Sequence, residues 1–113
     1  MADISRFVPT ESTTVTFTNS ASTTGWVAYR LFAGGLLYTQ SLSGASAGAY
    51  TVLVKDSPNG DSRVLYDSTG TVINAYIAPT TGASPVPDEA YAAAYFSILL
   101  TAGTATCKFH GKT

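Results

Sequence analysis

Charged residues are scarce in this sequence, and the scarcity excludes several classes of protein. Only 12% of the 113 residues are Asp, Glu, Lys or Arg, about half the average share, and the formal net charge is −1. Six Lys and Arg against seven Asp and Glu provide no basic surface, so we expect no nucleic-acid partner. No apolar run approaches the roughly 20 residues of a membrane-spanning helix, and the first residues lack the apolar core of a signal peptide. No membrane partner is therefore expected.

Cysteine and histidine occur once each, as Cys107 and His110, and this limits the chemistry available to the chain. A single cysteine excludes an internal disulfide, and a zinc site would need about four Cys, His or acidic ligands. The two residues are three positions apart, which on a strand places their side chains on opposite faces and not in a nucleophile–base pair. We expect Cys107 to be buried and His110 to be exposed near the chain end. No catalytic residue, metal or cofactor is predicted.

Acidic side chains do not converge in the sequence either. Asp88 and Glu89 are adjacent and therefore point apart, whereas the paired acids of glycosidases come from separate positions. Asp56, Asn59 and Asp61 lack the spacing and the trailing glutamate of a helical calcium-binding loop. We interpret these residues as solvated charges and turn formers.

Hydroxyl side chains and alternating apolar residues dominate instead, with 17 threonines and 12 serines. Residues 13–18 alternate, which places Val15 and Phe17 on one face, and residues 49–55 show the same period. Comparable short runs lie at 26–32, 36–42, 63–67, 71–77 and 104–109, with turn-forming residues between them. The pattern predicts an all-β protein, an immunoglobulin-like antiparallel β-sandwich of seven to eight short strands, with residues 1–113 as a single domain.

Turn chemistry predicts two hairpins. Gly34 and Gly35 follow Ala33 and favour a tight turn that pairs residues 36–42 back onto residues 25–32. A second hairpin is expected around Asp67–Gly70, because its residues suit the left-handed conformations that short loops require. Residues 25–32 have large side chains on both faces, so we expect them to form a central strand that is covered on both sides.

Two other segments break the alternation. Residues 78–87 hold three of the five prolines and predict an extended Pro/Thr loop, since proline removes a ladder donor. Residues 88–100 suit a helix at their acidic, alanine-rich start and a buried strand in their aromatic part. We favour a strand there and allow one short helix. Residues 1–12 are predicted to be a loosely held arm.

Aromatic residues make up 12% of the chain and suggest a second function. Trp26, Tyr29, Tyr38, Tyr66 and Tyr76 would form a sugar-stacking surface if several of them lay together on one exposed face, and Trp26, Tyr29 and Tyr38 are the candidate stacking residues. Core packing and cross-strand pairing are the more common uses of aromatic residues in sheets. A carbohydrate-binding module is the alternative to a protein-binding role, because both kinds of surface favour Tyr and Trp.

Three short motifs resemble a known family. They are Val27–Phe32 followed by Gly35-Leu36-Leu37, then Gly48–Val52, and last Val64–Gly70. Together they resemble the small β-sandwich modules of tailed-bacteriophage structural proteins, although many such modules have Trp where this chain has Tyr66. The resemblance implies a non-enzymatic virion component: a decoration, head–tail joining, baseplate or fibre-associated protein. It also implies synthesis in the host cytoplasm, and other virion proteins or further copies of the chain as partners.

The arm and the Pro/Thr loop are the candidate contact regions. Low charge and small hydroxyl side chains suit close contact with neighbours, since little charged surface must be desolvated. The candidate interface residues are Phe7, Val8 and Pro9 in the arm, and Pro79, Thr80, Thr81, Pro85, Val86 and Pro87 in the loop.

Overall fold

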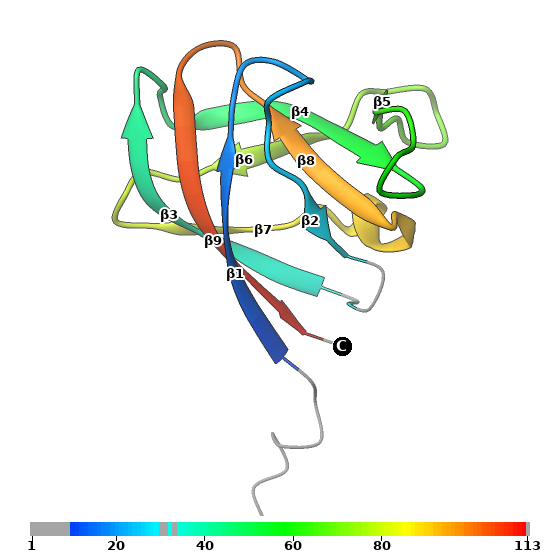
Figure 1. Cartoon of the computed structure of the whole chain (residues 1–113), viewed down its shortest axis with the longest axis horizontal. Coiled ribbons are helices and arrows are strands. Elements are labelled where there is room, and N and C mark those ends of the chain that lie inside the picture. Colours follow the sequence, from blue (N-terminus) through cyan, green and yellow to red (C-terminus); the bar gives the residue numbers. More distant parts are fainter. Residues whose placement is uncertain (1–9, 30–31, 33, 113) are drawn as a thin grey trace, which may run out of the picture.

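The computed structural model describes residues 10–29, 32 and 34–112, which form a sandwich of two antiparallel β-sheets (Figure 1). The predicted all-β sandwich is confirmed. Phe7, Val8 and Pro9 lie outside the described residues. Among the described residues, no helix is long and apolar enough to cross a membrane.

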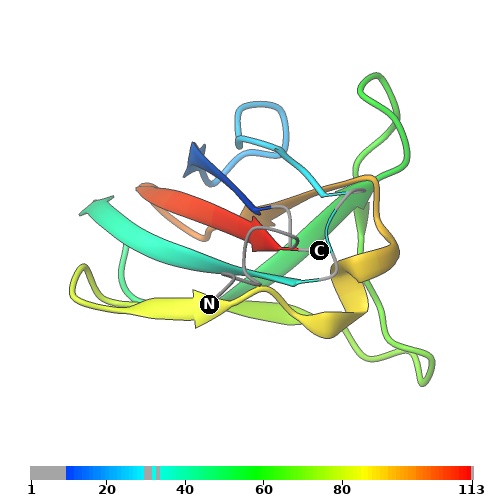
Figure 2. The ribbon, with the colours of Figure 1, turned by 90° about the horizontal axis from the view of Figure 1, so that it is seen from below.

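The two sheets are built from strands that are far apart in the sequence. Sheet A has the order β1 (Thr10–Phe17), β9 (Thr104–Lys112), β3 (Gly34–Ser43) and β7 (Ala83–Pro85). Sheet B has the order β2 (Val27–Ala28), β8 (Tyr95–Leu99) and β4 (Gly48–Lys55), and the far edge of β4 is shared by β5 (Arg63–Val64) and β6 (Asn74–Ile77). Figure 2 shows the four strands of sheet A side by side, from blue β1 to yellow β7.

The chain reaches this arrangement as one long hairpin that is rolled up. β1 pairs with β9, β2 with β8, β3 with β7 and β4 with β6, so that each antiparallel pair encloses the next. Successive pairs alternate between the two sheets. The β3–β9 ladder joins the two pairs of sheet A, and the β4–β8 ladder joins the two pairs of sheet B. This nested order is that of a jelly roll. Within the confirmed sandwich, the strand order thus differs from that of an immunoglobulin domain, because the first strand pairs with the last.

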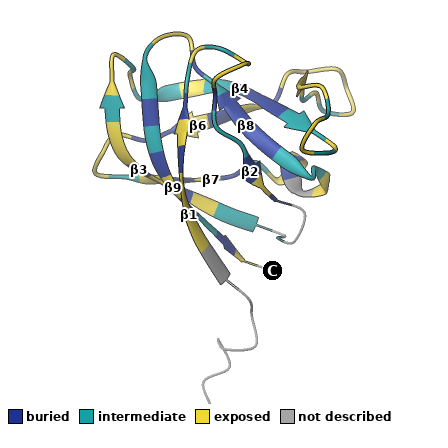
Figure 3. Cartoon of the chain, in the orientation of Figure 1, coloured by how far each residue is buried: buried dark blue, intermediate teal, exposed yellow. Residues whose placement is uncertain are grey.

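Alternating side chains fill the space between the sheets. Val15 and Phe17 face inward from β1, as predicted, and Cys107 is fully buried on β9. Figure 3 shows buried residues in dark blue along β8 and β9. At one end of the core, four aromatic rings contact each other at centroid distances of 5.1–6.3 Å. These rings belong to Tyr29, Phe32, Phe96 and Phe109.

The hairpin expected between residues 25–32 and 36–42 is wrong. β2 lies at the edge of sheet B and is not a central strand, whereas β3 pairs with β9 and β7 in sheet A. The glycines that suggested a tight turn have another use. A Cβ on Gly35 would lie 2.5 Å from the ring of Phe109, so glycine permits the close approach of β3 to the aromatic cluster.

The Pro/Thr segment is only partly a loop. Pro79 and the following residues form a turn, but Ala83–Pro85 is strand β7, against the expectation that no strand forms there. Proline is tolerated because β7 is the edge of sheet A, where one side of the strand needs no ladder donor. Val86 then donates its N–H to Gly35 O at 2.9 Å and is buried in the core.

Residues 88–100 contain both elements that the sequence allowed. A 3-10 helix, η2 (Asp88–Ala92), carries Asp88 and Glu89 in its first turn, and β8 follows it. Phe96 and Ile98 face the core from β8.

Residues 10–12, which were predicted to belong to a loosely held arm, are part of β1, and residues 1–9 lie outside the described residues. Ser12 pairs with His110 of β9, and Ser12 Oγ lies 2.9 Å from His110 Nδ1. His110 is therefore part of a strand and half-buried, in contrast to the exposed position expected for it.

Candidate functional site

Exposed apolar side chains gather on the face of sheet B that points away from sheet A. Four residues define what we call the apolar patch: Val64, Tyr66, Val72 and Tyr76. Their side chains are 40, 55, 37 and 50% exposed, respectively. None of the four is charged.

Strand alternation explains why the patch faces outward. Leu65 and Ile73 pack against the core, so their chain neighbours Val64, Tyr66 and Val72 point the other way. Tyr66 and Val72 are directly opposite each other in an antiparallel bridge. Ala75 and Ile77 face inward, which turns Tyr76 outward in the same manner.

A hydrogen-bonded turn joins the two segments that carry Tyr66 and Val72. Asp67 Oδ1 accepts hydrogen bonds from the N–H groups of Thr69 and Thr71, each at 2.9 Å, and from the Thr69 hydroxyl at 2.7 Å. These hydrogen bonds lower the pKa of Asp67 below its usual range, and the bond from the Thr69 hydroxyl contributes most to this shift. The turn predicted at Asp67–Gly70 is thus confirmed, with Gly70 at φ +86°.

The far end of the same face carries a cation between aromatic rings. Lys55 Nζ lies 4.4 Å from the ring centroid of Trp26 and 5.7 Å from that of Tyr95. Lys55 also donates a hydrogen bond to Pro58 O at 3.1 Å. Trp26 is only partly exposed, so its ring is held in place and is not a free stacking platform.

A hollow lined by charges of both signs lies beside this cation. Its volume is about 620 Å³, and its charged lining residues are Lys55, Asp56, Asp61 and Arg63. Asp56 and Asp61 lie on an exposed turn that Gly60 N–H closes onto Ser57 O, as expected for ordinary turn chemistry.

A second, polar hollow of about 300 Å³ lies on the outer face of sheet A. Its lining residues come from three neighbouring strands: Ser12, Tyr38, Gln40, Lys108 and His110. Tyr38 is 41% exposed and pairs with Lys108 across the ladder. The hollow joins an aromatic ring with amide, hydroxyl and ammonium groups and contains no acid.

The residues of the predicted glycan surface are separated by the fold. Tyr29 is 1% exposed and lies in the aromatic cluster, where burial raises its pKa. It cannot stack on a sugar. Trp26 belongs to the outer face of sheet B and Tyr38 to that of sheet A, so these candidates do not share one surface.

The predicted contact residues of the Pro/Thr segment are divided as well. Pro79, Thr80 and Thr81 are exposed at the turn between β6 and β7, and Pro85 is exposed on β7. Val86 is 4% exposed, so it serves the core and not an interface. Pro87 is half-buried before η2.

The apolar patch was not among the predicted contact residues. Alternation showed that residues 63–67 and 71–77 have two faces, but sequence alone does not show which face a second layer covers. The aromatic pattern suggests Tyr66 and Tyr76 only as members of a sugar-stacking surface and not as protein contacts; the signal for them is that they are large side chains on the face opposite Leu65 and Ala75.

The single cysteine and histidine form no reactive pair. Cys107 is buried in the core, which raises the pKa of its thiol, whereas His110 contributes to the outer face. Within the described ranges, no group of three or more His, Cys, Asp or Glu side chains could hold a metal ion.

Comparisons with known proteins found no matching family model, curated protein or solved structure. The candidate site therefore stands on its geometry alone.

Proposed function

We propose that this protein is a non-enzymatic structural component of a phage-like virion that acts through contacts with other proteins. The observation that carries the proposal is the apolar patch on the outer face of sheet B. The cores of protein interfaces are depleted in charged residues and enriched in aromatic ones, and the patch has this composition. Its two tyrosines combine large contact area with a hydroxyl that can find a partner.

The strand arrangement supports the same proposal. Jelly-roll sandwiches are common among viral capsid domains, although they also occur in lectins and cupins, so fold alone does not assign a role. The rigid Asp67 turn holds Tyr66 and Val72 in place before contact, which lowers the entropy lost on binding. A virion component would work as such a preformed surface, made in the host cytoplasm and docked onto other virion proteins.

The proposal is tested by co-assembly. We expect the genes beside this one to encode portal, capsid or tail proteins, and the experiment co-expresses their products with the chain. The wild-type chain should enter the resulting particles, whereas the double variant Tyr66→Ser/Tyr76→Ser should enter at least about tenfold less, as for the loss of interface hot spots.

Two controls make this result interpretable. The double variant should keep the wild-type melting temperature, because both side chains are exposed, and Tyr38→Ser on the opposite face should enter particles normally. Equal incorporation of the double variant and the wild type would overturn the proposed role of the patch.

Carbohydrate binding is the second candidate function, and the polar hollow on sheet A favours it. Tyr38 offers a ring face for stacking, while Gln40, Ser12 and Lys108 offer hydrogen-bonding groups around it. The probes are a glucuronate-containing hyaluronan tetrasaccharide and neutral cellotetraose, titrated by NMR. Binding lost in Tyr38→Ala but kept in Tyr66→Ala would support this function, and no shift with either sugar would contradict it.

A further inference from the structure

The edges of the two sheets are protected unequally. β7 is three residues long and contains Pro85, and β2 and β5 are two residues long each. Short strands and proline are the usual means by which proteins prevent an edge from pairing with another chain. β1, the other edge of sheet A, has eight residues, and its sequence contains neither lysine nor proline. Among the described residues, half of this edge has no backbone partner.

The hydrogen bonds of β1 show which half is open. Gly25 N–H donates to Thr16 O at 2.8 Å, so the following loop covers the C-terminal half of the edge. Backbone groups of alternate residues point to the same side of a strand, and Ser12 and Thr14 therefore direct their N–H and C=O groups away from β9, as Thr16 does. Neither residue has a backbone partner on that side among the described residues.

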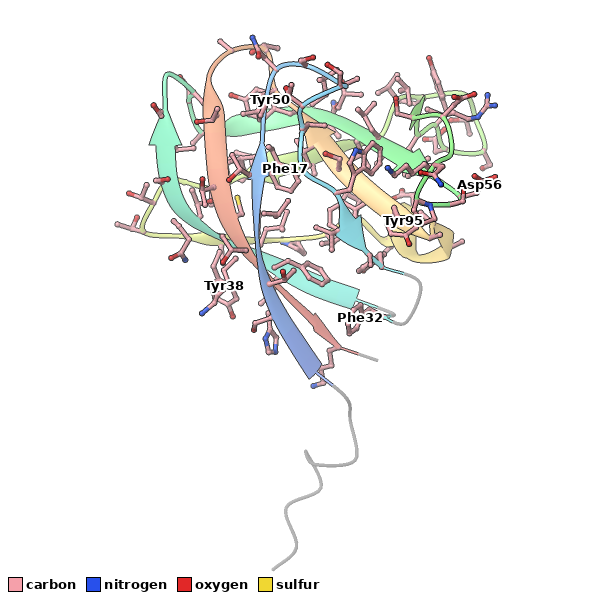
Figure 4. The ribbon with its side chains drawn as sticks, viewed as in Figure 1. Phe17, Phe32, Tyr38, Tyr50, Asp56 and Tyr95 are labelled. Carbon is pink, nitrogen blue, oxygen red and sulfur yellow. The ribbon has the colours of Figure 1, made fainter. Side chains whose placement is uncertain are left out.

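An apolar hollow lies directly beside the open half. It has a volume of about 230 Å³ and opens between the lower part of β1 and β2. Its walls are mainly aromatic and aliphatic: Thr13, Trp26, Val27, Ala28, Phe32 and Phe109. Figure 4 shows Phe32 below the end of β2. A cavity of roughly 150 Å³ already admits a benzene molecule, so this hollow can take an aromatic side chain.

An open edge next to a side-chain pocket is the arrangement used for strand addition. Main-chain hydrogen bonds hold the added strand, and a pocket selects its inward-facing side chains. Thr13 faces inward on β1, and the inward side chains of a strand added beside it would enter the hollow.

We propose that the segment Asp3–Val8 of a second copy of this chain adds to β1 and places Phe7 in the hollow. The proposal extends the proposed function, since it names another copy as one contact through which the protein assembles. In this segment Phe7 has Ser5 as its alternate neighbour on one side and Pro9 on the other. This face of the segment therefore carries a single large apolar side chain, Phe7, and the hollow beside β1 has room for one such side chain. Nine extended residues reach at most roughly 30 Å, enough to leave one subunit and lie along another.

Proline opposes the tightest return of the segment onto β1 of its own chain, which favours a second copy as the partner. Pairing with β1 of the same chain through a two-residue turn at Pro9-Thr10 would need type I′ or II′ geometry. Both types require a positive φ at the first turn position, and the proline ring holds φ near −65°.

The test measures the mass of the purified chain in solution by light scattering over a dilution series. The wild-type chain should form dimers or larger closed assemblies. Phe7→Ala should raise the dissociation constant at least about tenfold, whereas Ile4→Ala in the same segment should change it little. Ala28→Phe, which fills the hollow from the exposed wall, should also prevent association without lowering the melting temperature.

Disulfide trapping identifies the contact and its direction. One chain carries Phe7→Cys, the other Ala28→Cys, and both carry Cys107→Ala. Their mixture should give a cross-linked heterodimer under oxidation, whereas Ala49→Cys on the outer face of sheet B should not replace Ala28→Cys.

Three results would overturn the proposal. They are a monomer at every concentration, association that Phe7→Ala and Ala28→Phe leave unchanged, and a cross-link that forms only within one chain carrying both cysteines. Because purified protein is used, these results are independent of particle incorporation, which tests the proposed function.

Discussion

Buried hydroxyl groups are the polar residues that this low-charge protein uses inside its fold. Thr24 is 4% exposed, accepts a hydrogen bond from Thr18 N–H at 3.1 Å and donates one to Ile98 O at 2.9 Å. Ser97 is fully buried and donates to Gly25 O. These bonds join the loop after β1 to β8, and so connect the two sheets. A buried hydroxyl favours one arrangement of the surrounding chain more strongly than an apolar side chain does, because its hydrogen-bond partners are fixed.

Thr24→Val should therefore lower the free energy of unfolding by about 1–3 kcal/mol. Valine keeps the shape of the side chain but leaves the Thr18 N–H and the Ile98 carbonyl without this partner. Urea unfolding followed by tryptophan fluorescence measures the change. Thr23→Val is the matched control, since Thr23 is exposed and its loss should cost less than about 0.5 kcal/mol. Equal losses in both variants would contradict the role of burial.

At the scale of elements, two turns at one end of the sandwich pack against each other. Gly44 follows β3 and Gly103 precedes β9, and both have left-handed backbone, at φ +68° and +70°. The β3–β9 ladder continues to the pair Ser43↔Thr104, so these turns close the same end of sheet A. A Cβ on Gly103 would overlap the backbone of Gly44. Glycine is required here both for the backbone angle and for space.

Gly103→Ala should accordingly destabilise the protein by about 2–4 kcal/mol, since the strain of a left-handed residue adds to overpacking. Gly70→Ala separates the two effects. Gly70 also has a positive φ, but a Cβ there meets no atom within 4 Å, so only the strain of about 1–2 kcal/mol remains. Thermal and urea unfolding compare the two variants. If Gly70→Ala were as damaging as Gly103→Ala, close packing of the two turns would not be the cause.

For the whole molecule, the nested strand order divides the surface into regions of different chemistry. β9 lies between β1 and β3, so the end of the chain occupies the middle of sheet A and its outer face carries Lys108 and His110. The outer face of sheet B carries the apolar patch. The open half of β1 and its hollow form a third region at the side of the sandwich. A subunit with these separate surfaces could contact several neighbours at once.

Local features of the sequence determined the strands and much of the core. Alternation placed Val15 and Phe17 inward, the absence of partners for Cys107 indicated a buried thiol, and the residues around Asp67 specified a turn. These properties depend on side-chain period and turn chemistry, which act within a few residues.

Tertiary structure alone decided which strands pair and which faces stay exposed. Gly34 and Gly35 favour a tight turn locally, yet β3 pairs elsewhere, and Gly35 permits the approach of β3 to Phe109, a residue more than seventy positions away. The segment around Pro85 becomes a strand because β3 offers it an edge, and Tyr29 is buried while Tyr66 is exposed because only one face of each strand meets the opposite sheet. Strand pairing and layer packing join residues far apart in the chain, and a local pattern does not specify which distant strand completes it.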